Sequence, residues 1–157
     1  MIGILNETEV EEVLRKQFIG RIGCHSGDHI YVVPVSYAYD GRYVYVRTFE
    51  GKKIDILRKN PMVCFEVDES HNMADWKSVI GWGKFEELTK TEERNKALKI
   101  LIDRQLPLLS SDTSHIGDIW PFPPEDLTTI KGVVFRIWLK EKTGRYERTG
   151  IAPPMTG

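Results

Sequence analysis

The sequence predicts a mainly β domain in which about six antiparallel strands form a small barrel or a strongly curled sheet, flanked by two or three helices. Apolar residues alternate with a period of two in most segments after residue 21. Asp40-Gly41 stands between two of these segments as a hairpin-turn signal. The helical patterns are short, and 157 residues are enough for one domain with a buried core.

A short amphipathic helix is expected near the N-terminus. Residues 6–9, Asn-Glu-Thr-Glu, have the pattern of a capping box. Apolar residues then recur at helical spacing until the chain reaches Gly20, and they are Val10, Val13, Leu14 and Phe18.

Six strands are expected where β-branched and aromatic residues alternate with other types. They cover residues 21–24, 29–39, 42–49, 62–68, 77–88 and 132–140. Gly81 and Gly83 interrupt the fifth of these strands, which indicates a bulge or a close approach of another backbone.

Two more helices are expected between the strands. Residues 52–59 form a short one that stops at Asn60-Pro61. Another begins at about Thr89, and its apolar stripe at 97, 98, 101 and 102 should pack on the sheet. Residues 107–128 are rich in Pro, Ser and Asp, so we expect a long loop or flap there. Loops of this length often cover a bound ligand, and we expect this one to influence substrate choice.

Lys52 and Lys53 stand together where the short helix is expected to begin. The first turn of a helix carries unpaired N–H groups and the positive end of the helix dipole, so cations are disfavoured there. A bound anion such as phosphate reverses this preference, because the N–H groups and both ammonium groups can converge on it. The alternative is two solvated lysines with Glu50 and Asp55 as neighbours.

The composition narrows the range of partners and sites. With 22 Lys+Arg and 23 Asp+Glu the formal net charge is −1, so no general field favours nucleic acid, and no apolar run reaches the length of a membrane span. Cys24 and Cys64 are expected to be free thiols in a reducing compartment, which predicts a cytoplasmic protein. The four histidines are too scattered to predict a metal site, and no serine nucleophile motif or dinucleotide fingerprint is present.

A second set of residues suits an organic anion with an aromatic body. Arg47 and Thr48 end a strand just before the lysines, and Trp76 and Ser78 stand at the beginning of the fifth strand. The tyrosine-rich strand face that Arg47 shares is also typical of a core or a dimer interface.

Six blocks of sequence follow one another along nearly the whole chain. They are residues 34–37 (PVSY), 40–48 (DGRYVYVRT), 51–53 (GKK), 57–67 (LRKNPMVCFEV), 76–88 (WKSVIGWGKFEEL) and 134–145. In this order they resemble the FMN-binding split-barrel family, and within it the pyridoxamine 5′-phosphate oxidase-like branch that includes the nitroimidazole-resistance reductases. The resemblance implies a six-stranded antiparallel split β-barrel as a single flavin-binding domain over residues 1–150, with a C-terminal tail at 151–157.

The same resemblance implies a homodimer that binds FMN, or FAD, at the subunit interface. It assigns the flavin phosphate to Lys52 and Lys53, with Ser78 beside Trp76 reaching the phosphate region. It places two strand segments along the flavin ring, and their residues are Pro34, Val35 and Ser36 in one and Val46, Arg47 and Thr48 in the other. A flat flavin requires apolar walls, a phosphate clamp and a few polar groups at its edge, which these residue types supply.

The implied activity is that of an oxidoreductase that reduces a small planar acceptor such as a nitroimidazole. Because a flavin supplies the redox chemistry itself, no catalytic residue is assigned. Arg47 replaces a histidine that many relatives carry, which leaves flavin binding intact and weakens the expectation of antibiotic reduction. The basic C-terminal signature of the true oxidase is missing after Arg145.

Two alternatives remain open from the sequence. One is a non-catalytic flavin- or haem-binding module, in which His71 or His115 would be the haem ligand. The other is a plain dimeric interaction domain, which would leave the lysine pair unexplained.

Overall fold

The computed structural model describes residues 1–105 and 126–149. In this part of the chain the helices are α1 (Glu7–Lys16), α2 (Lys52–Lys59) and α3 (Thr91–Gln105), with a short 3-10 turn, η2 (Leu127–Thr129). The strands are β1 (Ile2–Ile4), β2 (Ile19–Ser26), β3 (His29–Ser36), β4 (Ala38–Tyr39), β5 (Tyr43–Thr48), β6 (Met62–Asn72), β7 (Asp75–Glu87) and β8 (Val133–Glu147).

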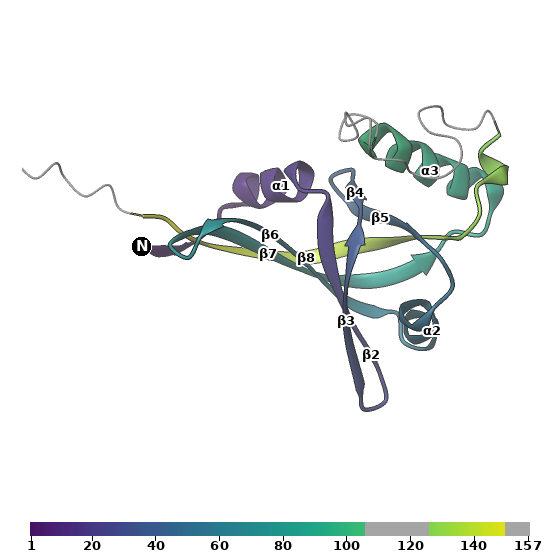
Figure 1. Cartoon of the computed structure of the whole chain (residues 1–157), viewed down its shortest axis with the longest axis horizontal. Coiled ribbons are helices and arrows are strands. Elements are labelled where there is room, and N and C mark those ends of the chain that lie inside the picture. The colour runs from purple at the N-terminus through teal and green to yellow at the C-terminus, as the bar shows by residue number, and fades with distance from the viewer. Residues whose placement is uncertain (106–125, 150–157) are drawn as a thin grey trace, which may run out of the picture.

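All of these strands belong to one antiparallel sheet with the order β3-β2-β6-β7-β8-β5-β4, and β1 is added beside β8. The β2–β3 hairpin extends away from the body as an arm, while α1 and α3 lie across the opposite side (Figure 1). The prediction of a mainly β, antiparallel fold with flanking helices is confirmed. The segments from residue 106 to 125 and from residue 150 onward lie outside the described residues, and they include most of the expected flap with Trp120.

The predicted number of six strands is wrong, because the described residues form eight. Residues 2–4 are too few to show an alternation, yet they pair with residues 145–147 at the far end of β8. The strand expected over residues 29–39 is divided at Tyr37, where the chain leaves β2 and joins β5. Tyr37 itself is buried, and its hydroxyl donates to the carbonyl of Leu14 at 2.7 Å, which anchors the crossing point to α1.

Several element boundaries also differ from those expected. The capping box at Asn6 and Glu9 is present, but α1 ends at Lys16, so Phe18 is not on the helix and is 47 % exposed. Strand β8 continues seven residues past Lys140, to Glu147, and its far end pairs with both β1 and β7. The close backbone approach expected at Gly83 is confirmed, since a Cβ there would lie 1.8 Å from the carbonyl oxygen of Trp138, beside a bulge in β7.

The core is divided into two parts by the sheet. Residues 44 and 46 of β5 point into the barrel, where the fully buried Phe65, Phe135 and Leu57 lie. Tyr45 points to the other face and packs under α3. The apolar residues in this second cluster are Ala38, Tyr45, Leu88, Ala97, Leu98, Leu101 and Val134. The tyrosine-rich face of β5 is therefore core under α3, which was one of the two structural roles left open for it.

Candidate functional site

The barrel is open between β3 and β5. Strand β5 pairs with β8 along one edge over its whole length, but on the other edge β4 covers only Val44 and Tyr45. Strand β3 ends two residues before Ala38, which pairs with Tyr45, so residues 34–36 approach residues 46–48 without pairing with them. We call this gap the β3–β5 seam. Its backbone edge at residues 46–48 is available to a ligand.

The seam ends at the N-terminus of α2. Gly51 is the N-cap and has no side chain, so no side-chain hydrogen bond caps the first turn of this helix. Lys52 and Lys53 are the first two helical residues, as the sequence predicts, and Lys52 Nζ lies 5.7 Å from the centre of the Tyr31 ring of β3. The helix is fixed to β2 at its other end, where Asn60 Nδ2 donates to the carbonyl oxygen of His25 at 3.0 Å.

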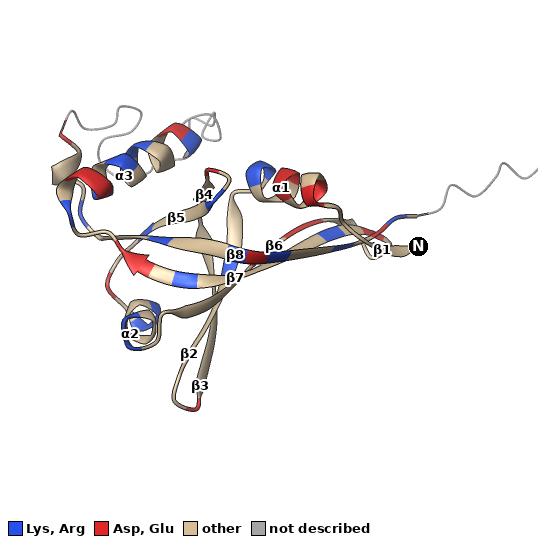
Figure 2. Ribbon diagram, turned by 180° about the vertical axis from the view of Figure 1, so that it is seen from behind, with Lys and Arg blue, Asp and Glu red and all other residues tan. Residues whose placement is uncertain are grey.

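Neither lysine has a carboxylate partner in the described part of the chain. Glu50, two residues before Lys52, is instead bound by Arg58 at 2.8 and 2.9 Å. In Figure 2, α2 with its Lys and Arg positions in blue lies beside the acidic end of β7. Among the described residues neither lysine pairs with Glu50 or Asp55, and the side chain of Lys52 is exposed to solvent. Two cations at the positive end of a helix dipole, with no acid between them, fit an anion.

Arg47 points away from the seam. Its Nε donates to the carbonyl oxygen of Lys131 at 2.8 Å, and its guanidinium lies 5.3 Å from the Phe49 ring centre. Burial lowers the pKa of Arg47, and the nearby charge of Arg94 lowers it further. Arg47 therefore braces the entry into β8, and it contributes its backbone to the seam.

The other seam residues divide by the alternation of their strands. Val46 and Val35 are 1 % and 8 % exposed, so their side chains belong to the core and only their backbone can reach a ligand. Pro34 and Ser36 are exposed on the opposite face of β3, and Thr48 is half-buried at the end of β5.

Trp76 and Ser78 lie elsewhere in the molecule. They are close to the β6–β7 turn, which lies at the opposite end of the sheet from α2 (Figure 1). Trp76 Nε1 donates to Glu147 at 3.0 Å, and Ser78 Oγ donates to Glu66 at 3.2 Å. One chain therefore brings together the two seam segments and the two lysines, but it does not bring Trp76 and Ser78 to them.

The outer face of the sheet carries an apolar surface that was not located from the sequence. The register places Val32, Gly23, Cys64 and Trp82 in one row across four strands. Ile30, Val32, Met62, Trp82 and Trp138 are between 39 % and 79 % exposed on this face. A cavity of about 720 Å³ opens here between the β2–β3 arm and β6–β7. Alternation could have indicated this face, because apolar residues occupy both faces of β3 and β7.

The described residues contain no cluster of three or more metal-ligating side chains. None of the helices in that same part is long and apolar enough to cross a membrane. His71, a candidate haem ligand, is 61 % exposed, and its Nε2 lies 3.2 Å from Glu69, whereas His115 is outside the described residues.

The fold and the site together define a split β-barrel whose open seam ends at a cationic helix N-terminus. The family model described as pyridoxamine 5′-phosphate oxidase matches residues 6–146, and the chain belongs to that family. An uncharacterised protein of Rhizobium meliloti is 28 % identical over 148 residues, which covers 92 % of this chain and 94 % of the relative.

Two solved structures extend the similarity to three dimensions. The FAD-binding protein of Mesorhizobium loti is 29 % identical, with a TM-score of 0.69 and coverage of 93 % of this chain and 98 % of the other. A candidate 5-nitroimidazole antibiotic resistance protein of Bacteroides thetaiotaomicron is 20 % identical, with a TM-score of 0.70 and coverage of 93 % and 87 %. At that identity the second similarity concerns the fold alone.

Proposed function

We propose that this protein binds FMN or FAD and, as a homodimer, reduces a small planar acceptor such as a nitroimidazole. One observation carries the proposal: Lys52 and Lys53 begin α2 without a carboxylate partner among the described residues, directly beside the unpaired backbone edge of β5. A flavin with a phosphate at one end and a flat ring at the other has the shape and charge for this combination.

The residues of the seam fit the parts of a flavin. The two ammonium groups and the uncapped N–H groups of α2 suit the phosphate. The backbone of residues 46–48 offers hydrogen-bonding groups to the polar edge of the ring, and Pro34 with Ser36 flanks the seam. When bound, a flavin supplies hydride and electron transfer, so the chain has to bind it, orient it and limit access of water.

A second copy of the chain would complete the site. Trp76 and Ser78 are remote from the lysines of their own chain, and they lie at the margin of the exposed apolar outer face. An apolar face of this extent on a small domain is typical of an interface between subunits. In the proposed dimer, Ser78 of one subunit serves the phosphate region of the flavin held by the other.

The two cysteines support a cytoplasmic location. Both are free, and the pairing of Cys64 with Gly23 puts Cys24 on the opposite face of the sheet from Cys64. The two thiols therefore do not form an intrachain disulfide, as is usual in a reducing compartment.

A flavin-binding module without turnover is the alternative, and one experiment separates the two. The absorption spectrum of the freshly purified protein should have flavin bands, and anaerobic mixing with NADH or NADPH should bleach them. Addition of a nitroimidazole or a quinone should then restore the bands over several turnovers. Flavin bands that no nicotinamide bleaches would favour the non-catalytic module, a Soret band would favour haem, and a colourless protein that binds no added flavin would contradict the proposal.

A further inference from the structure

We propose that Arg58 is a positioning residue for the phosphate end of the flavin site, because it holds the Glu50 carboxylate away from Lys52, Lys53 and the N-terminus of α2. This inference rests on the proposed flavin function and assigns a role to an ion cluster behind the site.

Arg58 spans the whole length of α2. It belongs to the last turn of the helix, yet its Nη1 and Nη2 donate to the two oxygens of Glu50, in the turn before the helix, at 2.8 and 2.9 Å. On its other side, Nε and Nη2 donate to Glu87 at 2.7 and 3.2 Å. One guanidinium therefore holds two carboxylates, and both are held through two oxygens.

Glu87 is the more firmly held of the two carboxylates that Arg58 binds. It ends β7, pairs with Phe135 of β8 in the sheet, and is 25 % exposed, whereas Glu50 is 64 % exposed. Glu87 is therefore held in place by the sheet. Arg58 binds Glu87 and Glu50 together, and in this way it fixes the exposed Glu50 in the turn before α2. The hydrogen bonds from Arg58 lower the pKa of Glu50, so this carboxylate is ionised throughout the neutral range.

An ionised Glu50 that was not held would compete with a bound phosphate. It precedes Lys52 by two residues, and the first turn of a helix attracts carboxylates both by its dipole and by its free N–H groups. A glutamate at this position would pair with the lysines or cap the helix, and its charge would repel the phosphate. Two hydrogen bonds from Arg58 hold Glu50 away from the lysines, and two more to Glu87 fix the position of the arginine.

The test compares two ligands that differ by the phosphate alone. Dissociation constants for FMN and for riboflavin would be measured by fluorescence quenching with wild type, Arg58→Ala, Glu50→Gln and the double variant. Wild type should bind FMN more tightly than riboflavin. Arg58→Ala should weaken FMN binding about tenfold and change riboflavin binding less than about twofold, because only the phosphate meets the released carboxylate.

The double variant shows whether the loss of FMN affinity comes from the charge of the released Glu50 or from the loss of a structural contact of Arg58. Glu50→Gln alone should leave FMN affinity unchanged or slightly higher, and Arg58→Ala with Glu50→Gln should recover FMN affinity to within about threefold of wild type. Arg148→Ala is the matched control, since Arg148 is similarly exposed, at 52 % against 41 %, and loses one ion pair, to Glu9, at the other end of the sheet. It should change neither affinity.

Thermal unfolding of each variant confirms that it is folded. If Arg58→Ala does not fold, Arg58→Lys keeps the charge but cannot hold both carboxylates, and it should give a smaller loss of FMN affinity that Glu50→Gln again reverses. An equal loss for FMN and riboflavin, or a double variant as weak as Arg58→Ala, would reduce Arg58 to a structural brace and overturn the inference. A wild type that binds both flavins equally, or neither, would overturn the phosphate site itself.

Discussion

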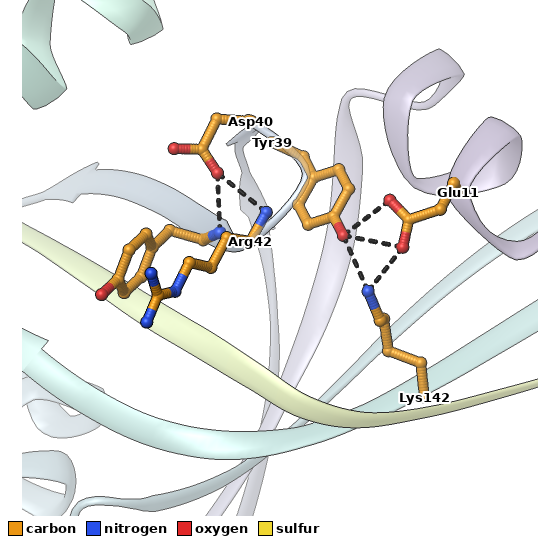
Figure 3. A network of polar contacts seen from close by, with 6 residues as sticks. Glu11, Tyr39, Asp40, Arg42 and Lys142 are labelled. Carbon is orange, nitrogen blue, oxygen red and sulfur yellow. Dashed lines mark hydrogen bonds and ion pairs between the residues drawn. The ribbon is translucent and has the colours of Figure 1, made fainter. Parts of the chain in front are cut away.

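Two polar regions of the molecule use lysine in opposite ways. Under α1, Lys142 of β8 donates to Glu11 and, at 3.0 Å, to the hydroxyl of Tyr39, which donates in turn to the same carboxylate at 2.8 Å (Figure 3). Lys142 and Glu11 are only 23 % and 26 % exposed. At α2, Lys52 and Lys53 have no carboxylate partner within the described residues, and the acid beside them is bound by Arg58.

The difference indicates which charges serve the fold and which serve a ligand. The Glu11–Tyr39–Lys142 cluster joins α1, β4 and β8, and every charged group in it has a partner within the chain. The α2 lysines form no ion pair in the described part of the chain, although Lys52 lies over the Tyr31 ring, and they remain in a position where positive charge is disfavoured. Under the proposed function, Lys52 and Lys53 bind the flavin phosphate, which favours positive charge at this helix N-terminus.

The largest effect is expected when both unpaired lysines are removed. Lys52→Ala with Lys53→Ala should weaken FMN binding by about a hundredfold or more, because two charge-assisted phosphate contacts of about 1.5 to 3 kcal/mol each are lost. The free energy of unfolding should stay within about 0.5 kcal/mol of wild type, since neither side chain belongs to the core. Fluorescence titration and urea unfolding give the two values.

The control for this variant lies on α3. Lys96 and Lys99 are also exposed helical lysines three residues apart, and their double alanine variant should bind FMN as wild type does. Unchanged FMN affinity in a folded Lys52→Ala, Lys53→Ala variant would exclude these lysines as the phosphate clamp.

A second prediction tests whether the proposed flavin site at α2 needs residues of a second subunit. The Glu11–Tyr39–Lys142 cluster, by contrast, lies within one chain. Trp82→Asp places a charge in the centre of the outer apolar face and should raise the dimer dissociation constant by about thirtyfold or more, since buried tryptophans at interfaces contribute about 2 kcal/mol or more. Sedimentation velocity at several concentrations measures this change.

Flavin should be lost together with dimerisation in this variant. Its apparent flavin affinity should depend on protein concentration, because only the dimer presents both halves of the site. A monomer that still holds flavin at wild-type affinity would show that the lysine region is complete in a single chain. Thr91→Asp, on exposed surface of α3, introduces the same charge away from the outer face and serves as the control.

The sequence predicts local structure in this protein better than it predicts the two polar regions. The Asp40-Gly41 turn is confirmed, with Gly41 at a φ of +98° and Asp40 Oδ1 accepting from the N–H groups of Arg42 and Tyr43 (Figure 3). Helix α2 begins and ends at the residues expected. Turns, caps and alternation depend on neighbours in sequence, so their signals are visible without a structure.

Contacts over long separations have no such signal. Lys142 meets Glu11 from 131 residues away, and Arg58 selects Glu87 from 29 residues away, although other acids stand closer in the chain. Strand β1 is defined only by its pairing with the end of β8. Proximity in sequence also suggested Glu50 as a partner for the lysines, whereas in the structure Arg58 binds it. The bounds of α2 could be predicted from local signals, but the separation of Ser78 from the lysines required the sheet register.

A third prediction concerns the contribution of the Glu11–Tyr39–Lys142 cluster to the stability of the fold. Glu11→Ala leaves Lys142 partly buried without its carboxylate and Tyr39 without an acceptor, so the free energy of unfolding should fall by about 2 kcal/mol. FMN affinity should stay within about twofold of wild type, the reverse of the lysine variant. Glu12→Ala, an exposed neighbour on α1, should change neither quantity. A weakened flavin site in Glu11→Ala at unchanged stability would show that the two regions are coupled.

The smallest effect should appear in the pH dependence of stability. Burial raises the pKa of Tyr39, and the contact with Glu11 adds to this although the bond from Lys142 opposes it. Burial lowers the pKa of Lys142, but the bonds with Glu11 and Tyr39 outweigh it, so that this pKa is raised. A group whose pKa is higher in the folded state stabilises the fold below its ordinary pKa, and that contribution is lost as the pH rises through the folded value. For both groups the loss begins above about pH 10. Above about pH 10 the Tyr39→Phe, Lys142→Met variant should therefore lose less stability than wild type in urea unfolding. Part of the alkaline loss should remain in the variant, because burial also raises the pKa of Tyr45 to about 12. If the stability of the variant falls with rising pH as steeply as that of wild type, the alkaline loss comes from other tyrosines and not from the Glu11–Tyr39–Lys142 cluster.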